Sequence, residues 1–283
     1  MRSRIAVILE GESREFAIWK SISRYFFPNT DIDLFFLPAK GNIYMLWKQT
    51  EQDNQETDLI ELIRDSDPAI ADQLKDLRRD DFQEIYLFFD LDPHQDNLGI
   101  KDAGKAEEIV EHMLETFDNE TELGKLYLSY PMVEALRDYR AGTCRAHTDC
   151  FYPVKDTGHY KHDSAQNNPN SNTNRYIHAT WLHLVAIFIQ KCYCLMGRRF
   201  ADGAEDTLRW YWDVINPLII YQRQRVIMNE REKVFVLSAF PEFLLDYFRE
   251  DYWLTLDEEI KRISADACPL SFDQHPHREP GDY

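Results

Sequence analysis

Short runs of consecutive apolar residues punctuate the first half of the chain. They cover Arg4–Leu9, Asp33–Leu37, Glu84–Phe89 and Lys125–Ser129. Runs of this length predict strands that are covered on both faces of a parallel sheet. Between them, Ser13–Phe27 and Asp102–Phe117 repeat apolar residues at helical spacing. Strands that alternate with helices predict parallel βαβ units, so residues 1–140 are expected to form one α/β domain.

The second half of the chain has a different pattern. A polar loop without periodicity lies near residues 160–176, and apolar residues recur at helical spacing from Trp181 onward. Further helices are expected at Leu208–Ile220, Val234–Phe248 and Leu256–Ile263. Residues 141–283 are therefore predicted to form a mainly helical accessory domain.

Three local signals refine these expectations. Ser13 is a good N-cap for the first helix. Pro131 predicts that a helix begins there, because proline is tolerated in the first helical turn. Residues 51–82 are strongly charged with sparse apolar positions, which predicts an exposed helical insertion.

The composition is that of a folded protein. Apolar residues make up 44% and charged residues 29% of the 283 residues, and only 10 Gly and 12 Pro are present, which excludes a disordered or collagen-like chain. No apolar run approaches the roughly 20 residues of a membrane-spanning helix, and the run that ends at Leu9 is too short for a secretory signal. Five cysteines, an odd number, argue against a disulfide framework. We therefore expect a cytoplasmic protein without a membrane partner.

Charge is distributed unevenly along the chain, whose formal net charge is −18. Residues 1–140 hold 16 basic and 30 acidic residues, net −14, and residues 141–283 hold 16 and 20, net −4. Such a chain is not expected to bind nucleic acid over its whole surface. A polyanion would approach residues 191–233, net +2, or would need cations placed on the acidic half. The candidate phosphate contacts are Lys40, Arg198 and Arg199, with ordinary solvated surface positions as the alternative.

Acidic residues follow the predicted strands where each strand ends. Glu10 follows the first strand, Asp90 and Asp92 follow the third, and Glu134 lies shortly after the fourth. Ligands of parallel sheets bind beyond the carboxyl ends of the strands, and alternation along an extended chain puts Asp90 and Asp92 on one side. Converging carboxylates repel each other unless a cation compensates them, and Mg²⁺ favours oxygen ligands. The alternative is that Glu15 and Glu134 lie in first turns of helices, where the helix dipole favours acids, and that other acids lie at strand ends by chance in an acid-rich chain.

This combination resembles the Toprim domain, which topoisomerases, bacterial primases, ribonuclease M-five-like enzymes and overcoming-lysogenization-defect (OLD) nucleases share. The resemblance rests on Val-Ile-Leu-Glu-Gly at 7–11 and Leu-Phe-Phe-Asp-Leu-Asp at 87–92, and it covers roughly residues 4–140. Segments similar to the OLD branch in particular are Leu9–Ser13, Ala39–Asn42 and Ser129–Glu134.

The sequence departs from the OLD pattern at two places. OLD-like sequences often carry an acid four positions after the first Glu, where this chain has Arg14, with Glu15 one residue further on. The glycine that commonly follows Asp-x-Asp is absent, because Pro93-His94-Gln95 follows instead.

The resemblance implies a Toprim-like (Rossmann-like) fold and metal-assisted phosphoryl transfer. By it, Glu10 is the acid–base residue or a metal ligand, Asp90 and Asp92 hold Mg²⁺, and Glu134 completes a second metal position. Mn²⁺ is the alternative ion. A strand-passing topoisomerase needs a tyrosine in a separate domain, and primases need further domains, so a hydrolytic nuclease acting on DNA or RNA is the simplest use of this domain.

The resemblance also implies partners. Small standalone proteins that resemble the OLD branch are often effectors of bacterial anti-phage defence, held by an ATPase partner protein. An acidic surface suits a protein that does not bind nucleic acid freely. Self-association into a homo-oligomer is a further expectation.

Two other functions fit parts of the sequence. A haloacid-dehalogenase-type phosphatase also carries Asp-x-Asp at a strand end, but usually on its first strand and with Thr or Val where this chain has His94. A non-catalytic interaction protein with a decayed site is the other alternative. The spacing of Cys144, His147 and Cys150 does not match a structural zinc site.

Overall fold

The computed structural model describes residues 2–28, 31–52, 58–93, 103–138, 150–166, 168–197, 207–254 and 257. The chain is an α/β protein that divides into two compact units. The first comprises Met1–Asp90 and Gln95–Leu128, and the second comprises Leu91–His94 and Ser129–Tyr283. The sequence suggested a division at residue 140, whereas Ser129–Glu134 belongs to the second unit.

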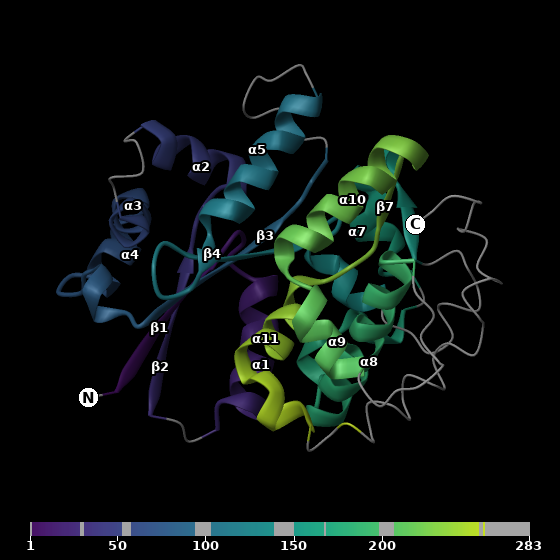
Figure 1. Ribbon diagram of the computed structural model, residues 1–283. Coiled ribbons are helices and arrows are strands. Elements are labelled where there is room, and N and C mark those ends of the chain that lie inside the picture. Colours follow the sequence, from purple (N-terminus) through teal and green to yellow (C-terminus); the bar gives the residue numbers. More distant parts are fainter. Residues whose placement is uncertain are drawn as a thin grey trace. The chain divides into compact units, whose positions relative to one another are not determined.

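A five-stranded, mostly parallel sheet forms the first unit, as expected for a Rossmann-like fold (Figure 1). Its order is β2-β1-β3-β5-β4. The strands are β1 Ser3–Leu9, β2 Ile32–Pro38, β3 Glu84–Asp90, β4 Asp118–Asn119 and β5 Gly124–Ser129. β1 runs parallel to β2 and β3, with Leu9 opposite both Pro38 and Phe88, whereas β4 is antiparallel to β5. The predicted strands are confirmed to within one residue at each end, and the short β4 was not predicted.

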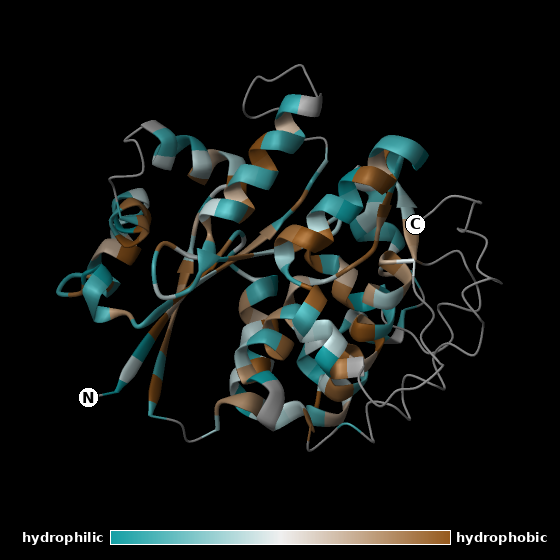
Figure 2. Ribbon diagram, in the orientation of Figure 1, coloured by the Kyte–Doolittle hydropathy of each residue, from teal (hydrophilic) through white to brown (hydrophobic). Residues whose placement is uncertain are grey.

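Helices cover both faces of this sheet (Figure 1). The helices of the first unit are α1 Arg14–Phe26, α2 Ile43–Gln52, α3 Leu59–Ser66, α4 Pro68–Gln73, the 3₁₀ helix η1 Arg79–Asp81 and α5 Ala103–Thr116. On one face, the buried Trp19 of α1 meets the ring of Phe88 edge to face at 5.2 Å. On the other, Trp47 of α2 contacts the ring of Phe117, which follows α5, at 5.9 Å. Hydrophobic and hydrophilic stretches alternate along α5, as expected of a helix with one buried face (Figure 2).

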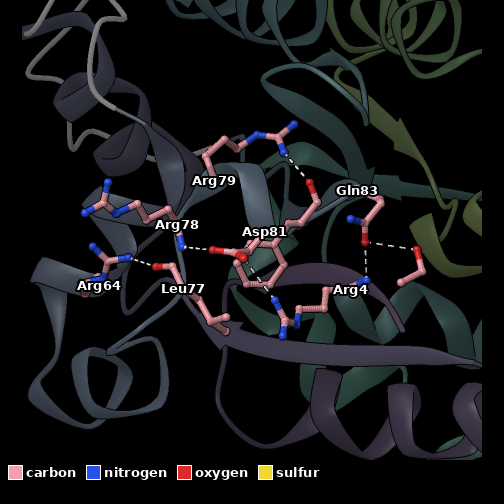
Figure 3. A network of polar contacts seen from close by, with 9 residues as sticks. Arg4, Arg64, Leu77, Arg78, Arg79, Asp81 and Gln83 are labelled. Atoms are coloured by element: carbon pink, nitrogen blue, oxygen red, sulfur yellow. Dashed lines mark hydrogen bonds and ion pairs between the residues drawn. The ribbon is translucent and has the colours of Figure 1, made fainter. Parts of the chain in front are cut away.

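The charged insertion is helical, as predicted, but its apolar residues are buried rather than exposed. They are Leu59, Ile60, Ile63, Ile70 and Leu74. Its Arg79 and Asp81 form a polar network with Arg4 of β1 and the backbone near the start of β1 (Figure 3). Arg79 donates to the carbonyl oxygens of Thr121 at 2.7 Å and Glu122 at 3.0 Å, and Arg4 pairs with Asp81 at 3.2 Å. These cations therefore serve the structure at the amino end of the sheet.

Gly124 is required where β5 begins. Its φ is +120°, and a Cβ there would lie 2.7 Å from Cδ1 of Leu87 in the neighbouring β3. Both the backbone conformation and the close approach of β3 exclude a larger residue.

The second unit is mainly helical, as predicted. Its elements are η2 Val133–Asp138, β6 Phe151–Pro153, η3 Val154–His159, α7 Tyr160–Asp163, η4 Pro169–Ser171, η5 Thr173–Arg175, α8 His178–Leu195, α9 Thr207–Val214, α10 Pro217–Arg231, β7 Lys233–Phe235 and α11 Ala239–Leu254. The antiparallel pair of β6 and β7 was not predicted. Among the helices of the described ranges, none is long and apolar enough to cross a membrane.

Two predicted helices of this unit have the wrong limits. The helix expected at Leu208–Ile220 is two helices, because the Asn216 side chain accepts from the amide of Ile219 at 2.9 Å and caps a new helix that begins at Pro217. The helix expected at Val234–Phe248 begins only at Ala239, because Val234 pairs with Tyr152 in the β6–β7 ladder. Of the helix expected at 256–263, the structure describes only Asp257, which is helical.

The polar loop near 160–176 consists of short helical turns held by asparagines: the Asn168 amide is buried and donates to the carbonyl oxygens of Arg137 at 2.9 Å and Ser164 at 2.8 Å. One further local prediction is wrong. Pro131, after a cis peptide bond, does not begin a helix, and η2 begins at Val133. The reason is that Tyr130 still pairs with Leu237 in an antiparallel bridge, which keeps the chain extended beyond β5.

Side chains from two helices hold the segment that follows α10. The buried Gln224 of α10 donates from Nε2 to the carbonyl oxygen of Phe235 at 2.7 Å and accepts from its amide at 2.9 Å. The buried Lys191 of α8 donates from Nζ to the carbonyl oxygen of Val236 at 2.9 Å. These side chains therefore provide hydrogen-bond partners for backbone groups that are buried away from water.

Gln224→Ala tests this role. The change leaves the buried amide and carbonyl of Phe235 without their side-chain partner, so we expect the free energy of unfolding to fall by about 2–4 kcal/mol. Urea unfolding of the full chain measures it. Gln222→Ala, at a half-buried position of the same helix, is the matched control, and an equal loss in both variants would contradict the prediction.

Candidate functional site

Glu10 and Asp90 meet at the carboxyl edge of the sheet. Glu10 follows β1 and Asp90 ends β3, and the amide of Glu10 continues the pairing by donating to the carbonyl oxygen of Phe88 at 3.1 Å. The amide of Asp90 donates to Oε2 of Glu10 at 2.8 Å. The carboxylate of Glu10 therefore reaches across to the neighbouring strand and is held beside Asp90 by a charge-assisted hydrogen bond.

A third carboxylate lies against the turn after β1. Glu15, in the first turn of α1, is only 8% exposed, and a Cβ added to Gly11 would lie 2.7 Å from its Oε2. Gly11 thus leaves the space that the carboxylate of Glu15 occupies. From the sequence, Glu15 could be explained by the helix dipole alone. It also lies one residue beyond the position at which OLD-like sequences often carry an acid. Its placement beside Gly11 follows from the turn that connects β1 to α1.

Lys40 lies at the same edge, directly after β2. The amide of Ala39 donates to the carbonyl oxygen of Leu9 at 2.8 Å, which ties the loop after β2 to the residue before Glu10. Nζ of Lys40 lies 2.8 Å from Oε1 of Glu12 and also pairs with the carboxylate of Asp67. The Asp67 and Glu12 carboxylates raise the pKa of Lys40 above its usual value. Lys40 therefore stays protonated and acts as a fixed positive charge.

Asp67 was not found from the sequence. It comes from the charged insertion, where its side chain caps α4 by accepting from the amide of Ala69 at 2.6 Å. The Lys40 ammonium lowers the pKa of Asp67 below its usual value. The sequence does not distinguish an aspartate that only caps a helix from one that also forms an ion pair. Only the packing of the insertion brings Asp67 to Lys40.

Asp92 and Glu134 belong to the second unit. β3 ends at Asp90, and Asp92 has a left-handed φ of 31°, so the alternation of an extended strand does not extend to it. The Asp92 amide donates to the carbonyl oxygen of Pro131 at 3.2 Å. Glu134 is 3% exposed, with Nζ of Lys161 at 4.0 Å. Their roles as metal ligands stay predictions.

The donor set of the first unit suits Mg²⁺. Within the described ranges, no three His, Cys, Asp or Glu side chains are grouped so that they could hold a metal ion. Mg²⁺ keeps several waters and commonly binds through one or two carboxylates together with substrate phosphates, which Glu10 and Asp90 can provide. The positions Arg198, Arg199, His94, Cys144 and His147 lie outside the described residues.

No family model matches the chain, and no curated protein or solved structure shows significant similarity to it. Any function must therefore be argued from the residues and their geometry.

Asp67→Asn tests the ion pair with Lys40, because asparagine keeps the ability to cap α4 and only the charge is lost. The pKa of Asp67 is lowered in the folded protein, so its charge stabilises the fold above the unfolded pKa of about 3.9 and this contribution is lost as the pH falls through the folded pKa. We expect the variant to melt below the wild type at about pH 7 and the difference to vanish near pH 2. Melting curves across this range check it, and a difference that is independent of pH would contradict it.

Proposed function

We propose that the chain is a Mg²⁺-dependent nuclease of the Toprim type that hydrolyses phosphodiester bonds in DNA or RNA, with Mn²⁺ as the alternative ion. The observation that carries the proposal is the meeting of Glu10 and Asp90 on adjacent parallel strands. In the family that the sequence resembles, the Glu-Gly and Asp-x-Asp motifs follow two such strands. The position of Gly11 beside Glu10 and Glu15 also supports it.

The residues of the first unit have separate tasks in this proposal. Glu10 and Asp90 would hold the ion, which when bound polarises the phosphate and lowers the pKa of a water. The amide of Asp90 fixes the carboxylate of Glu10 in place before substrate arrives, so little reorganisation is needed during the reaction. Glu15 adds negative charge beside them. Lys40 adds positive charge at the same edge, where a phosphate would need it.

Glu10 is also the candidate acid–base residue. Its Oε2 accepts from the amide of Asp90, and a carboxylate held in this way could accept a proton from an attacking water. Asp92 and Glu134 are proposed as further ligands, to be tested by Asp92→Asn and Glu134→Gln.

The partners follow from the charge. A chain of net charge −18 repels nucleic acid at a distance, so we propose that tight substrate binding at physiological salt depends on the metal ion, on a homo-oligomer or on an ATPase partner protein. A cytoplasmic role in anti-phage defence is part of the same proposal.

Glu10→Gln and Asp90→Asn test the chemistry. Glutamine keeps an oxygen that accepts from the amide of Asp90, so the fold is retained while a charge is removed. We expect cleavage of a labelled oligonucleotide with Mg²⁺ to fall roughly 100-fold or more and the metal-free melting temperature to stay equal or rise slightly, because repulsion is relieved.

Glu61→Gln, an exposed acid of α3, is the matched control and should cleave like the wild type. Variants that melt well below the wild type and still cleave would show that these acids are structural. Hydrolysis of a phosphomonoester without cleavage of an oligonucleotide would favour the phosphatase instead.

Gly11→Ala tests the place of Glu15. The added Cβ displaces the flexible end of Glu15 rather than backbone, so we expect the free energy of unfolding to change by less than about 1 kcal/mol while cleavage falls roughly tenfold. Urea unfolding and the cleavage assay measure the two effects. Gly158→Ala is the control, because a Cβ there meets nothing within 4 Å; unchanged cleavage in Gly11→Ala would exclude Glu15 from the site.

A further inference from the structure

Lys40 has an unusual backbone for a lysine. Its φ is +54°, in the left-handed region, which favours glycine and asparagine. A glycine would adopt this conformation without strain, and the chain has one at the next position, Gly41. Position 40 itself carries a lysine with a long charged side chain. Left-handed residues other than glycine are uncommon, and they occur often at functional sites.

The two carboxylates that hold Lys40 are not equivalent. Asp67 is 14% exposed on its side chain and is anchored a second time by the amide of Ala69. Glu12 is 60% exposed and lies in the loop between β1 and α1. Water screens an exposed ion pair such as Lys40–Glu12, so it contributes little to stability and exchanges easily. The Lys40–Asp67 contact instead fixes where the ammonium sits.

Lys40 carries its charge at physiological pH, as an ordinary lysine does, and its two carboxylate partners raise its pKa further. It is therefore unsuited to proton transfer and suited to binding an anion. Glu12 presents one carboxylate oxygen to Nζ at 2.8 Å, which is the distance and charge that a phosphate oxygen would offer.

We infer that Lys40 binds a phosphate of the nucleic-acid substrate, and that Glu12 occupies in the free protein the place which a phosphate oxygen takes in the complex. Asp67 is then a positioning residue that keeps the ammonium at the edge where Glu10 and Asp90 lie. This inference rests on the proposed function, because it names how the same edge recognises its substrate. Glu12 then competes with the phosphate for the ammonium of Lys40.

Binding without cleavage tests the inference. A fluorescein-labelled oligothymidylate is titrated with the full chain at low salt in EDTA, and fluorescence anisotropy reports the affinity. We expect Glu12→Gln to bind about three- to tenfold more tightly than the wild type. Lys40→Gln should bind more weakly and lower the slope of log K against log salt by about 0.7, which is one phosphate contact on a single strand.

Matched controls separate the replacement of Glu12 by a phosphate at Lys40 from the general effect of a change in net charge. Asp72→Asn removes one exposed acid from α4, and Lys48→Gln removes one exposed cation from α2. In a double-mutant cycle, the gain from Glu12→Gln should shrink to that of Asp72→Asn once Lys40 is replaced by Gln. Asp67→Asn should gain no more than Asp72→Asn.

Four results would overturn the inference: a Glu12→Gln gain no larger than that of Asp72→Asn, a gain that persists without Lys40, an equal gain from Asp67→Asn, or no measurable binding by Glu12→Gln. Mg²⁺-dependent cleavage by the wild type is scored separately. Cleavage without coupling between Lys40 and Glu12 removes this inference and leaves the nuclease. Coupling without cleavage under any divalent ion removes the nuclease and leaves a phosphate-binding edge.

Discussion

The parallel pairing of β1 with both β2 and β3 determines where the chemistry of the first unit lies. Leu9 is opposite Pro38 on one side and Phe88 on the other. Three chain segments therefore leave the sheet at the same edge. Glu10, Lys40 and Asp90 are the polar residues that these segments bring there, although up to 80 residues separate them in sequence. Because the strand interiors are buried, a slip in register would expose apolar residues and misplace all three.

The two ends of the sheet use charge differently. At the amino end, Arg4 pairs with Asp81 and thereby holds β1 to the segment before β3. Arg79 binds the backbone carbonyl oxygens of Thr121 and Glu122. Positive charge there stabilises the fold. At the carboxyl end, the carboxylate of Glu10 accepts from the amide of Asp90 and that of Glu15 lies against Gly11. The positive charge of Lys40 is there paired with the carboxylates of Glu12 and Asp67.

Much of this architecture was predictable, because buried strands leave continuous apolar runs that few other structures produce. Glu10 and Asp90 could be found by the rule that strand ends form sites. Asp92 could not be placed by the same rule, since the strand ends at Asp90 and the backbone then turns left-handed. The limits of α9 and α10 were missed because the apolar periodicity continues through Asn216, whose capping role depends on its side-chain hydrogen bond. Asp67 reaches Lys40 only through tertiary packing.

An acidic site for an anionic substrate contains a conflict. The carboxylates that would hold Mg²⁺ also repel the phosphate that must reach it, and the −18 net charge adds to that repulsion. A free lysine would reduce the repulsion but would also collect any small anion. Lys40 together with Glu12 and Asp67 forms a group of net negative charge, which becomes neutral when Glu12 leaves. A ligand with several phosphates gains more from displacing Glu12 than a free phosphate does, because its other phosphates can make further contacts. On the proposed function, the exchange would thus favour a polymer over a free phosphate at the edge where Glu10 and Asp90 lie.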